Sequence, residues 1–205
     1  MAGFFMLHCA KDQQATARMG LDAINRLVTA ETLQYTDYKD LSEVAKSRLG
    51  DPMKVYTLGL DDIDKYADGK TAAQLFREDD SFVYPVYVGD EIRSSVAIQK
   101  VGGKWEIMEL GGRIAFSAEP GKKRMLEVQK DFKGPYFVVY VPAMYLIMLG
   151  YENDGKLYLA PTHDHPDLKI KPLEAVVADV ALRDLKANTR KYRNALVPGN
   201  RDEIK

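Results

Sequence analysis

The residues best suited to chemistry lie in one short segment, Thr162 to Asp167, which reads THDHPD. It holds two of the three histidines in the chain. Imidazole nitrogens and carboxylates are ligands for zinc and similar ions. His163 and His165 would face the same way on a strand, but a third ligand must come from elsewhere. Turn chemistry alone accounts for a loop rich in Asp, His and Pro, and we favour that interpretation.

The same string resembles the first metal motif of the metallo-β-lactamase superfamily, T-H-x-H-x-D-H. Leu168 stands where that motif has its last histidine, and no histidine follows His165. The family needs further histidines downstream, and too few residues remain for the rest of its fold. We therefore do not assign the chain to this superfamily. A metal-dependent enzyme or metal-binding protein that uses the His163/His165 loop is kept as the alternative hypothesis.

Other reactive side chains form no recognisable constellation. Acid/base catalysis needs two carboxyl groups in a cleft with separated pKa values, and sequence neighbours such as Asp61 and Asp62, or 78–80, rarely provide that. No G-x-S-x-G element is present. Cys9 and His8 would point to opposite faces of a strand. The sequence thus assigns no catalytic, cofactor-binding or metal-ligating residue, and predicts no cofactor.

Composition narrows the class of protein. The chain has 205 residues, enough for one large domain or two small packed units. Its 29 basic residues balance 30 acidic ones, so the basic surplus typical of nucleic-acid-binding proteins is missing and no nucleic-acid partner is predicted. A single cysteine excludes an internal disulfide. The longest uncharged stretch, 134–151, is broken by Pro135, Pro142 and Gly150, so no transmembrane segment is predicted.

The first ten residues are apolar apart from His8. They fit a first strand from Phe4 to Cys9, the remnant of a trimmed signal sequence, or a lipoprotein signal that ends at Cys9 as an N-terminal tether. We favour the strand and leave the cellular compartment open.

Hydrophobic periodicity predicts the elements that must position any site. Residues 12–30 are predicted helical because apolar residues recur on one face: Ala17, Leu21, Ile24 and Val28. Asp40 can cap a second short helix in the manner of a capping box with Glu43. A strand is predicted over 53–58 and a short helix over 71–76.

The clearest signal is an antiparallel meander between Phe82 and Leu110. Its strands are separated by the turn pairs Gly89-Asp90 and Gly102-Gly103. In its middle strand Ile92, Ser94, Val96 and Ile98 alternate with Arg93, Ser95, Ala97 and Gln99, which predicts opposite faces for the two sets. A helix near 118–132, strands over 136–141, 144–149 and 157–159, and a last helix opened by Pro172 follow.

This order predicts an α+β fold with mostly antiparallel sheet and helices packed on one face, which is cystatin-like in architecture only. Two helix-plus-sheet halves are one option, because LGDPMKVY from Leu49 and FKGPYFVV from Phe132 both run from a helix end through glycine and proline into a strand. We expect residues 1–112 and 113–205 to form two parts of one compact unit.

Functionally, the sequence favours a non-catalytic binding or protein-interaction module. Twelve tyrosines include several on predicted strands, and tyrosine is enriched at protein interfaces. A sheet face carrying Tyr84 or Tyr140 would provide a binding surface for another protein or a small ligand.

Overall fold

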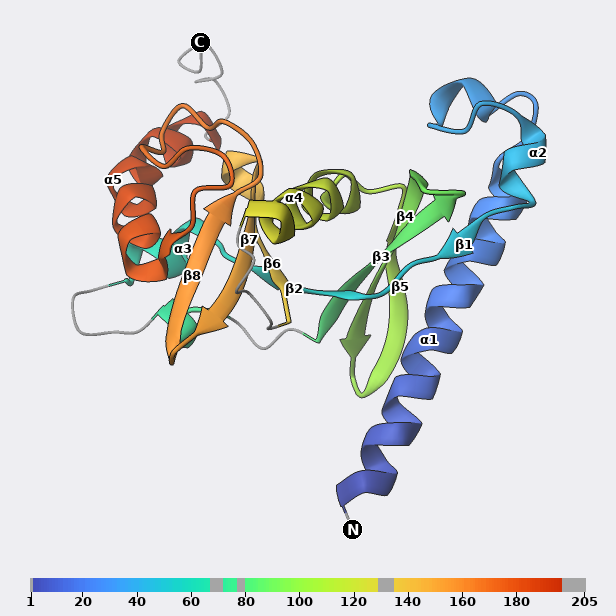
Figure 1. The fold of residues 1–205 in the computed structure, drawn as a ribbon, viewed down its shortest axis with the longest axis horizontal. Helices are drawn as coiled ribbons and strands as arrows, with labels where there is room; N and C mark the ends of the chain where they lie inside the picture. Colours follow the sequence, from blue (N-terminus) through green and yellow to red (C-terminus); the bar gives the residue numbers. More distant parts are fainter. Residues whose placement is uncertain (1, 67–71, 77–79, 129–134, 197–205) are drawn as a thin grey trace. The chain divides into compact units, whose positions relative to one another are not determined.

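The structure, a computed structural model, describes residues 2–66, 72–76, 80–128 and 135–196 (Figure 1). Within these ranges it contains five α-helices and nine strands, and every strand pair whose register is defined is antiparallel. The predicted α+β class is therefore confirmed. No helix in these ranges is long and apolar enough to cross a membrane.

The chain divides into two compact units. The first unit contains residues 1–55 and 79–119, and the second contains residues 56–78 and 120–205. Helix α4, Ile114–Val128, begins in the first unit and ends in the second. The predicted division into 1–112 and 113–205 stays a prediction.

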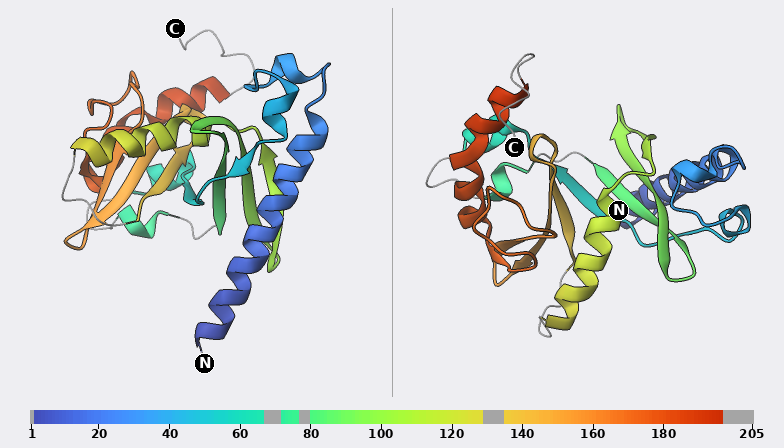
Figure 2. Two further views of the ribbon diagram at one scale, coloured as in Figure 1. Left: turned by 45° about the vertical axis from the view of Figure 1, so that its right-hand side comes forward. Right: turned by 90° about the horizontal axis from the view of Figure 1, so that it is seen from above.

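The first unit combines one long helix with a meander of strands. Its elements are α1 (Ala2–Leu27), the 3₁₀ turn η1 (Leu33–Tyr35), α2 (Leu41–Val44), β1 (Arg48–Leu49), β2 (Met53–Thr57, the end of which belongs to the second unit), β3 (Ser81–Val88), β4 (Glu91–Val101) and β5 (Lys104–Leu110). Figure 2 shows α1 running beside these strands. The meander follows the predicted turns, where Gly89 and Gly102 both adopt a φ of +58°, a conformation that favours glycine.

Helix α1 packs on the meander through small residues. Ala17 is fully buried, and a Cβ atom built on Gly20 would lie 2.4 Å from Cγ1 of Val96 on β4. The predicted helix over 12–30 is thus present, but the predicted strand from Phe4 to Cys9 is wrong, since α1 includes those residues. A short apolar run does not distinguish strand from helix, and a helix that has already nucleated extends through it at little cost.

The second unit packs helices against a second set of antiparallel strands. Its elements are α3 (Leu60–Asp64), η2 (Ala72–Gln74), β6 (Phe137–Val141), η3 (Pro142–Met144), β7 (Leu146–Asn153), β8 (Lys156–Pro161), β9 (Val176–Val177) and α5 (Ala178–Leu196). Its core joins α3 and α5 to the strands, with Leu58, Ile63, Leu146, Met148, Leu159, Leu182 and Leu185 all fully buried. In Figure 1, α5 (red) lies beside β8 (orange).

Several boundaries of helices and strands differ from those predicted from the sequence. The last helix begins at Ala178 and not near Pro172, because Leu173 has a φ of +62° that no right-handed helix allows. Pro120 lies inside α4 and not in its first turn. The proposed repeat is not supported at Leu49, which ends strand β1 and not a helix. Its second copy starts at Phe132, outside the described residues.

Candidate functional site

The contacts of His165 are those of a residue that stabilises the fold. Its side chain is buried, with Nε2 3.0 Å from the carbonyl oxygen of Met144. The amide of Asp167 donates to its Nδ1 over 3.3 Å. Nε2 must therefore carry the proton that Met144 accepts, so both ring nitrogens are used. His163 is half-buried, and its Nδ1 lies 3.1 Å from Thr162 Oγ1.

Asp167 ties this loop to helix α5. It accepts a hydrogen bond from the hydroxyl of Tyr192 and forms an ion pair with Lys191 at 3.1 Å. Burial and the hydrogen bond to Asp167 raise the pKa of Tyr192. Among the residues that the structure describes, no group of three His, Cys, Asp or Glu side chains could hold a metal ion. The geometry thus favours a structural loop, and the metal hypothesis stays an untested alternative.

The predicted carboxylate cluster also has partners. Arg193 on α5 pairs with Asp61 and Asp64 on α3, and Asp62 accepts a hydrogen bond from the amide of Gly59. The hydrogen bond from Arg193 lowers the pKa of Asp61. Residues 78 and 79 of the second acidic run lie outside the described residues. Asp61 and Asp64 thus fasten α3 to α5 through Arg193.

The predicted tyrosine-bearing surface is not available at Tyr84. That side chain is 4% exposed and packs in the core of the first unit with Ala17 and Ile24 of α1. Burial raises the pKa of its hydroxyl. Tyr140 on β6 is half-buried. The predicted surface is thus excluded at Tyr84, and at Tyr140 it stays a prediction.

The first unit has a half-open pocket of about 440 Å³ where the end of α1 meets β4, β5 and the segment after the helix. Its walls are apolar, formed by Ile24, Leu27, Val28 and Leu110. Its volume lies in the range of roughly 300–1,000 Å³ that is typical of ligand sites.

Two large apolar side chains stand exposed among the residues that line this pocket. Leu27 is 61% exposed and Tyr35 is 83% exposed, so both present apolar surface to solvent beside the pocket. Tyr38 lines the interior, is 5% exposed, and accepts a hydrogen bond from Ser47 Oγ at 3.0 Å. Burial raises the pKa of Tyr38, so its phenol stays neutral at physiological pH.

Arg93 closes one side of the pocket, and a β-bulge places it there. On β4, Ser94 pairs with Val86 and Ile92 pairs with Tyr87, so Arg93 is an extra residue with no partner on β3. A bulge turns the strand locally and redirects a side chain. Beyond the bulge Ser94, Ser95 and Val96 are all buried in succession, so both faces of β4 are covered at this position.

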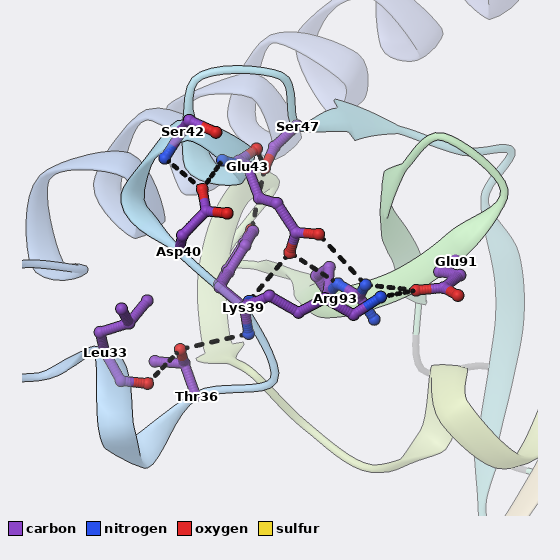
Figure 3. A network of polar contacts seen from close by, with 10 residues as sticks. Leu33, Thr36, Lys39, Asp40, Ser42, Glu43, Ser47, Glu91 and Arg93 are labelled. Atoms are coloured by element: carbon purple, nitrogen blue, oxygen red, sulfur yellow. Dashed lines mark hydrogen bonds and ion pairs between the residues drawn. The ribbon is translucent and has the colours of Figure 1, made fainter.

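The redirected guanidinium organises a polar network with the segment around α2 (Figure 3). Its Nε donates to Glu43 Oε2 at 2.9 Å and its Nη2 to Glu43 Oε1 at 3.2 Å, and Nη2 also pairs with Glu91. The amide of Lys39 donates to the same Glu43 carboxylate at 2.9 Å. Asp40 caps α2 by accepting from the amides of Ser42 at 2.7 Å and Glu43 at 3.1 Å. The predicted capping box is only half formed, because the Glu43 carboxylate accepts from the amide of Lys39, one residue before the cap.

These contacts fix the charges of the network. The hydrogen bond from Arg93 holds the pKa of Glu43 below its usual value, and the Glu43 carboxylate raises the pKa of Arg93. The hydrogen bond from Lys39 lowers the pKa of Glu91. The guanidinium charge beside the pocket is thus already compensated, and none of the other described residues that line the pocket is basic.

No protein family model matches the chain, and neither the curated proteins nor the solved structures contain a significant match. The pocket is therefore interpreted from its own residues. It holds apolar walls, neutral hydroxyl groups and a compensated ion pair, and none of its residues forms a nucleophile–base pair. Sequence patterns could not reveal it, because Arg93 gives no signal of its bulge.

Proposed function

We propose that this chain is a non-catalytic protein-interaction module, and that the pocket of the first unit holds an apolar anchoring side chain of the partner. The observation that carries the proposal is the exposure of Leu27 and Tyr35 among the residues that line an apolar pocket. Protein interfaces are typically centred on a large apolar or aromatic anchor that fills a pocket with a polar rim.

The pocket's chemistry supports a neutral apolar guest. Its interior walls include Ile24, Val28 and Leu110, while Thr32, Thr36 and Asp37 also line it and supply polar groups. Because Arg93 is paired with Glu43, an anionic guest would have to displace a two-point ion pair. The hydrogen bonds that join the segment around α2 to Arg93 support a preorganised site, which lowers the entropic cost of binding.

Selection from a library of random peptides displayed on phage, with the full chain as target, tests this proposal. We expect the selected peptides to share one Leu, Phe, Tyr or Trp and to lose binding to the variant Leu27→Asp. Met19→Asp is a matched control, since Met19 lies on the same helix and is 62% exposed but does not line the pocket. Peptides without a common apolar residue, or peptides that ignore Leu27→Asp, would overturn the proposal.

A further inference from the structure

The second unit has a separate pocket of about 670 Å³ beside the β7–β8 hairpin. Three aromatic residues from distant parts of the chain line it: Tyr56 at the end of β2, Phe76 after η2, and Phe137 at the start of β6. Leu157 on β8 adds an apolar wall. Neither the proposed interaction function nor the His165 loop involves these residues.

The three rings pack in one cluster, in which one pair of rings is stacked and the other two pairs meet edge to face. Tyr56 stacks on Phe76 with ring centroids 5.4 Å apart, and Phe137 stands edge-on to Tyr56 at 5.2 Å and an interplanar angle of 89°. Phe76 and Phe137 lie 5.9 Å apart at 63°. Phe76 is 9% exposed and belongs to the core, whereas Tyr56 and Phe137 are half-buried, so these two supply most of the ring surface at the pocket. A ring face carries the negative part of the aromatic quadrupole.

The ring of Phe137 fits on the sheet because its partner on β7 is a glycine, which leaves space for the ring. It pairs with Gly150 across β6 and β7, and a Cβ atom on Gly150 would lie 2.1 Å from Phe137 Cε2. The Phe137 ring therefore lies directly over the glycine. This fixes one wall of the pocket.

The other side of the pocket carries negative charge. Glu152 ends near the tip of β7 and Asp154 lies in the turn that follows, and both are exposed. Neither carboxylate has an ion pair with any residue in the described ranges, and no described residue that lines the pocket is basic. Aromatic rings attract a cation, and nearby carboxylates neutralise its charge. This environment favours a cation that loses little hydration energy when it leaves water.

We propose that this aromatic pocket binds an alkylated ammonium group, of which a quaternary ammonium is the best fit. Methyl groups on nitrogen spread the charge and contact ring faces, which is the recognition that aromatic cages use. A hard metal ion would instead require several oxygen ligands, whereas the described side chains that line this pocket are mostly apolar and aromatic. Glu152 and Asp154 supply long-range attraction, while Tyr56, Phe76 and Phe137 supply contact.

Choline titrated into the full, isotope-labelled chain and followed by two-dimensional NMR tests this proposal. The neutral carbon isostere 3,3-dimethylbutan-1-ol has the same shape without the charge. We expect choline to shift the aromatic signals of Tyr56, Phe76 and Phe137 and to bind at least about fivefold more tightly than the isostere, as a ring–cation attraction requires. Equal affinities, or shifts elsewhere in the chain, would overturn it.

Variants of the two carboxylates test whether their charge contributes to choline binding while the fold stays unchanged. Glu152→Gln and Asp154→Asn should each weaken choline binding by about threefold, the size expected for an exposed charge pair, and leave the isostere unaffected. Glu174→Gln, an exposed glutamate of the same unit that does not line the pocket, is the matched control and should change nothing. Unchanged choline affinity in the double variant Glu152→Gln/Asp154→Asn, with an unchanged circular dichroism spectrum, would contradict the site.

Two sources could supply the same ammonium group, a free small molecule or a lipid headgroup. Sedimentation with phosphatidylcholine vesicles distinguishes them, with phosphatidylglycerol vesicles as the control. Binding of free choline without vesicle binding indicates a soluble ligand. Binding to phosphatidylcholine vesicles that choline competes away indicates a headgroup.

Discussion

Arg93 on β4 is joined to Glu43 on α2 by two parallel hydrogen bonds, with Nε 2.9 Å from Oε2 and Nη2 3.2 Å from Oε1. The pair is enclosed, since the side chains are 11% and 15% exposed. A two-point contact of this kind fixes orientation as well as distance. It therefore fastens the segment around α2 to the bulged strand at the pocket.

Arg93→Met should weaken the first unit. The variant keeps an apolar stem but leaves the Glu43 carboxylate without its guanidinium partner, so we expect a lower urea midpoint at pH 7. Trp105, the only tryptophan, lies on β5 and reports unfolding of the first unit by fluorescence. Lys39→Met is the control, because it removes only the pair with Glu91, whose side chains are 65% and 60% exposed. Equal midpoints for the two variants would show that the Arg93–Glu43 contact is not needed.

The same pair predicts a pH dependence. The pKa of Glu43 is lower in the folded chain than in the unfolded chain, where a glutamate titrates near about 4.3. The stabilisation is therefore complete above that pH and is lost as the pH falls through the folded pKa. Wild type and Glu43→Gln should differ in urea midpoint at pH 7, and the difference should shrink as the pH falls below the unfolded pKa, as measured by Trp105 fluorescence. A difference that grows on acidification would contradict this account.

The sequence predicts what depends on local signals. The turn pairs Gly89-Asp90 and Gly102-Gly103 mark the meander correctly because turns with positive φ favour glycine. The capping role of Asp40 is likewise local. The bulge at Arg93 is not local, since it depends on how β4 pairs with β3, and the pocket depends on the bulge. The aromatic cluster of the second unit joins residues as distant as Tyr56 and Phe137, which no pattern links.

Gly150→Ala should destabilise the second unit by about 1–3 kcal/mol, the usual cost of overpacking, because its Cβ would overlap the Phe137 ring. The double variant Gly150→Ala/Phe137→Leu tests the cause, since a smaller side chain at 137 makes room. In a double-mutant cycle, the loss from Gly150→Ala should shrink in the Phe137→Leu background. Additive losses, measured by chemical denaturation followed by circular dichroism, would show that the two residues do not compete for space.

His165→Ala should destabilise the chain, whereas His163→Ala should have little effect. The first variant leaves the buried Met144 carbonyl without its donor, at a cost of about 1–3 kcal/mol, and removes the acceptor of the half-buried Asp167 amide. Elemental analysis for zinc and thermal denaturation with and without added zinc provide the measurements. Bound zinc, or stabilisation by zinc that either variant abolishes, would revive the metal hypothesis.

The central claim is that the pocket of the first unit accepts an apolar side chain. Titration of N-acetyl-phenylalaninamide into the isotope-labelled chain, followed by two-dimensional NMR, tests it most directly. We predict that the backbone signals of Ile24, Ser94 and Gly111 shift, that N-acetyl-alaninamide shifts them far less, and that Leu27→Asp but not Met19→Asp abolishes the response. Shifts that avoid these residues, or that persist in Leu27→Asp, would contradict the account.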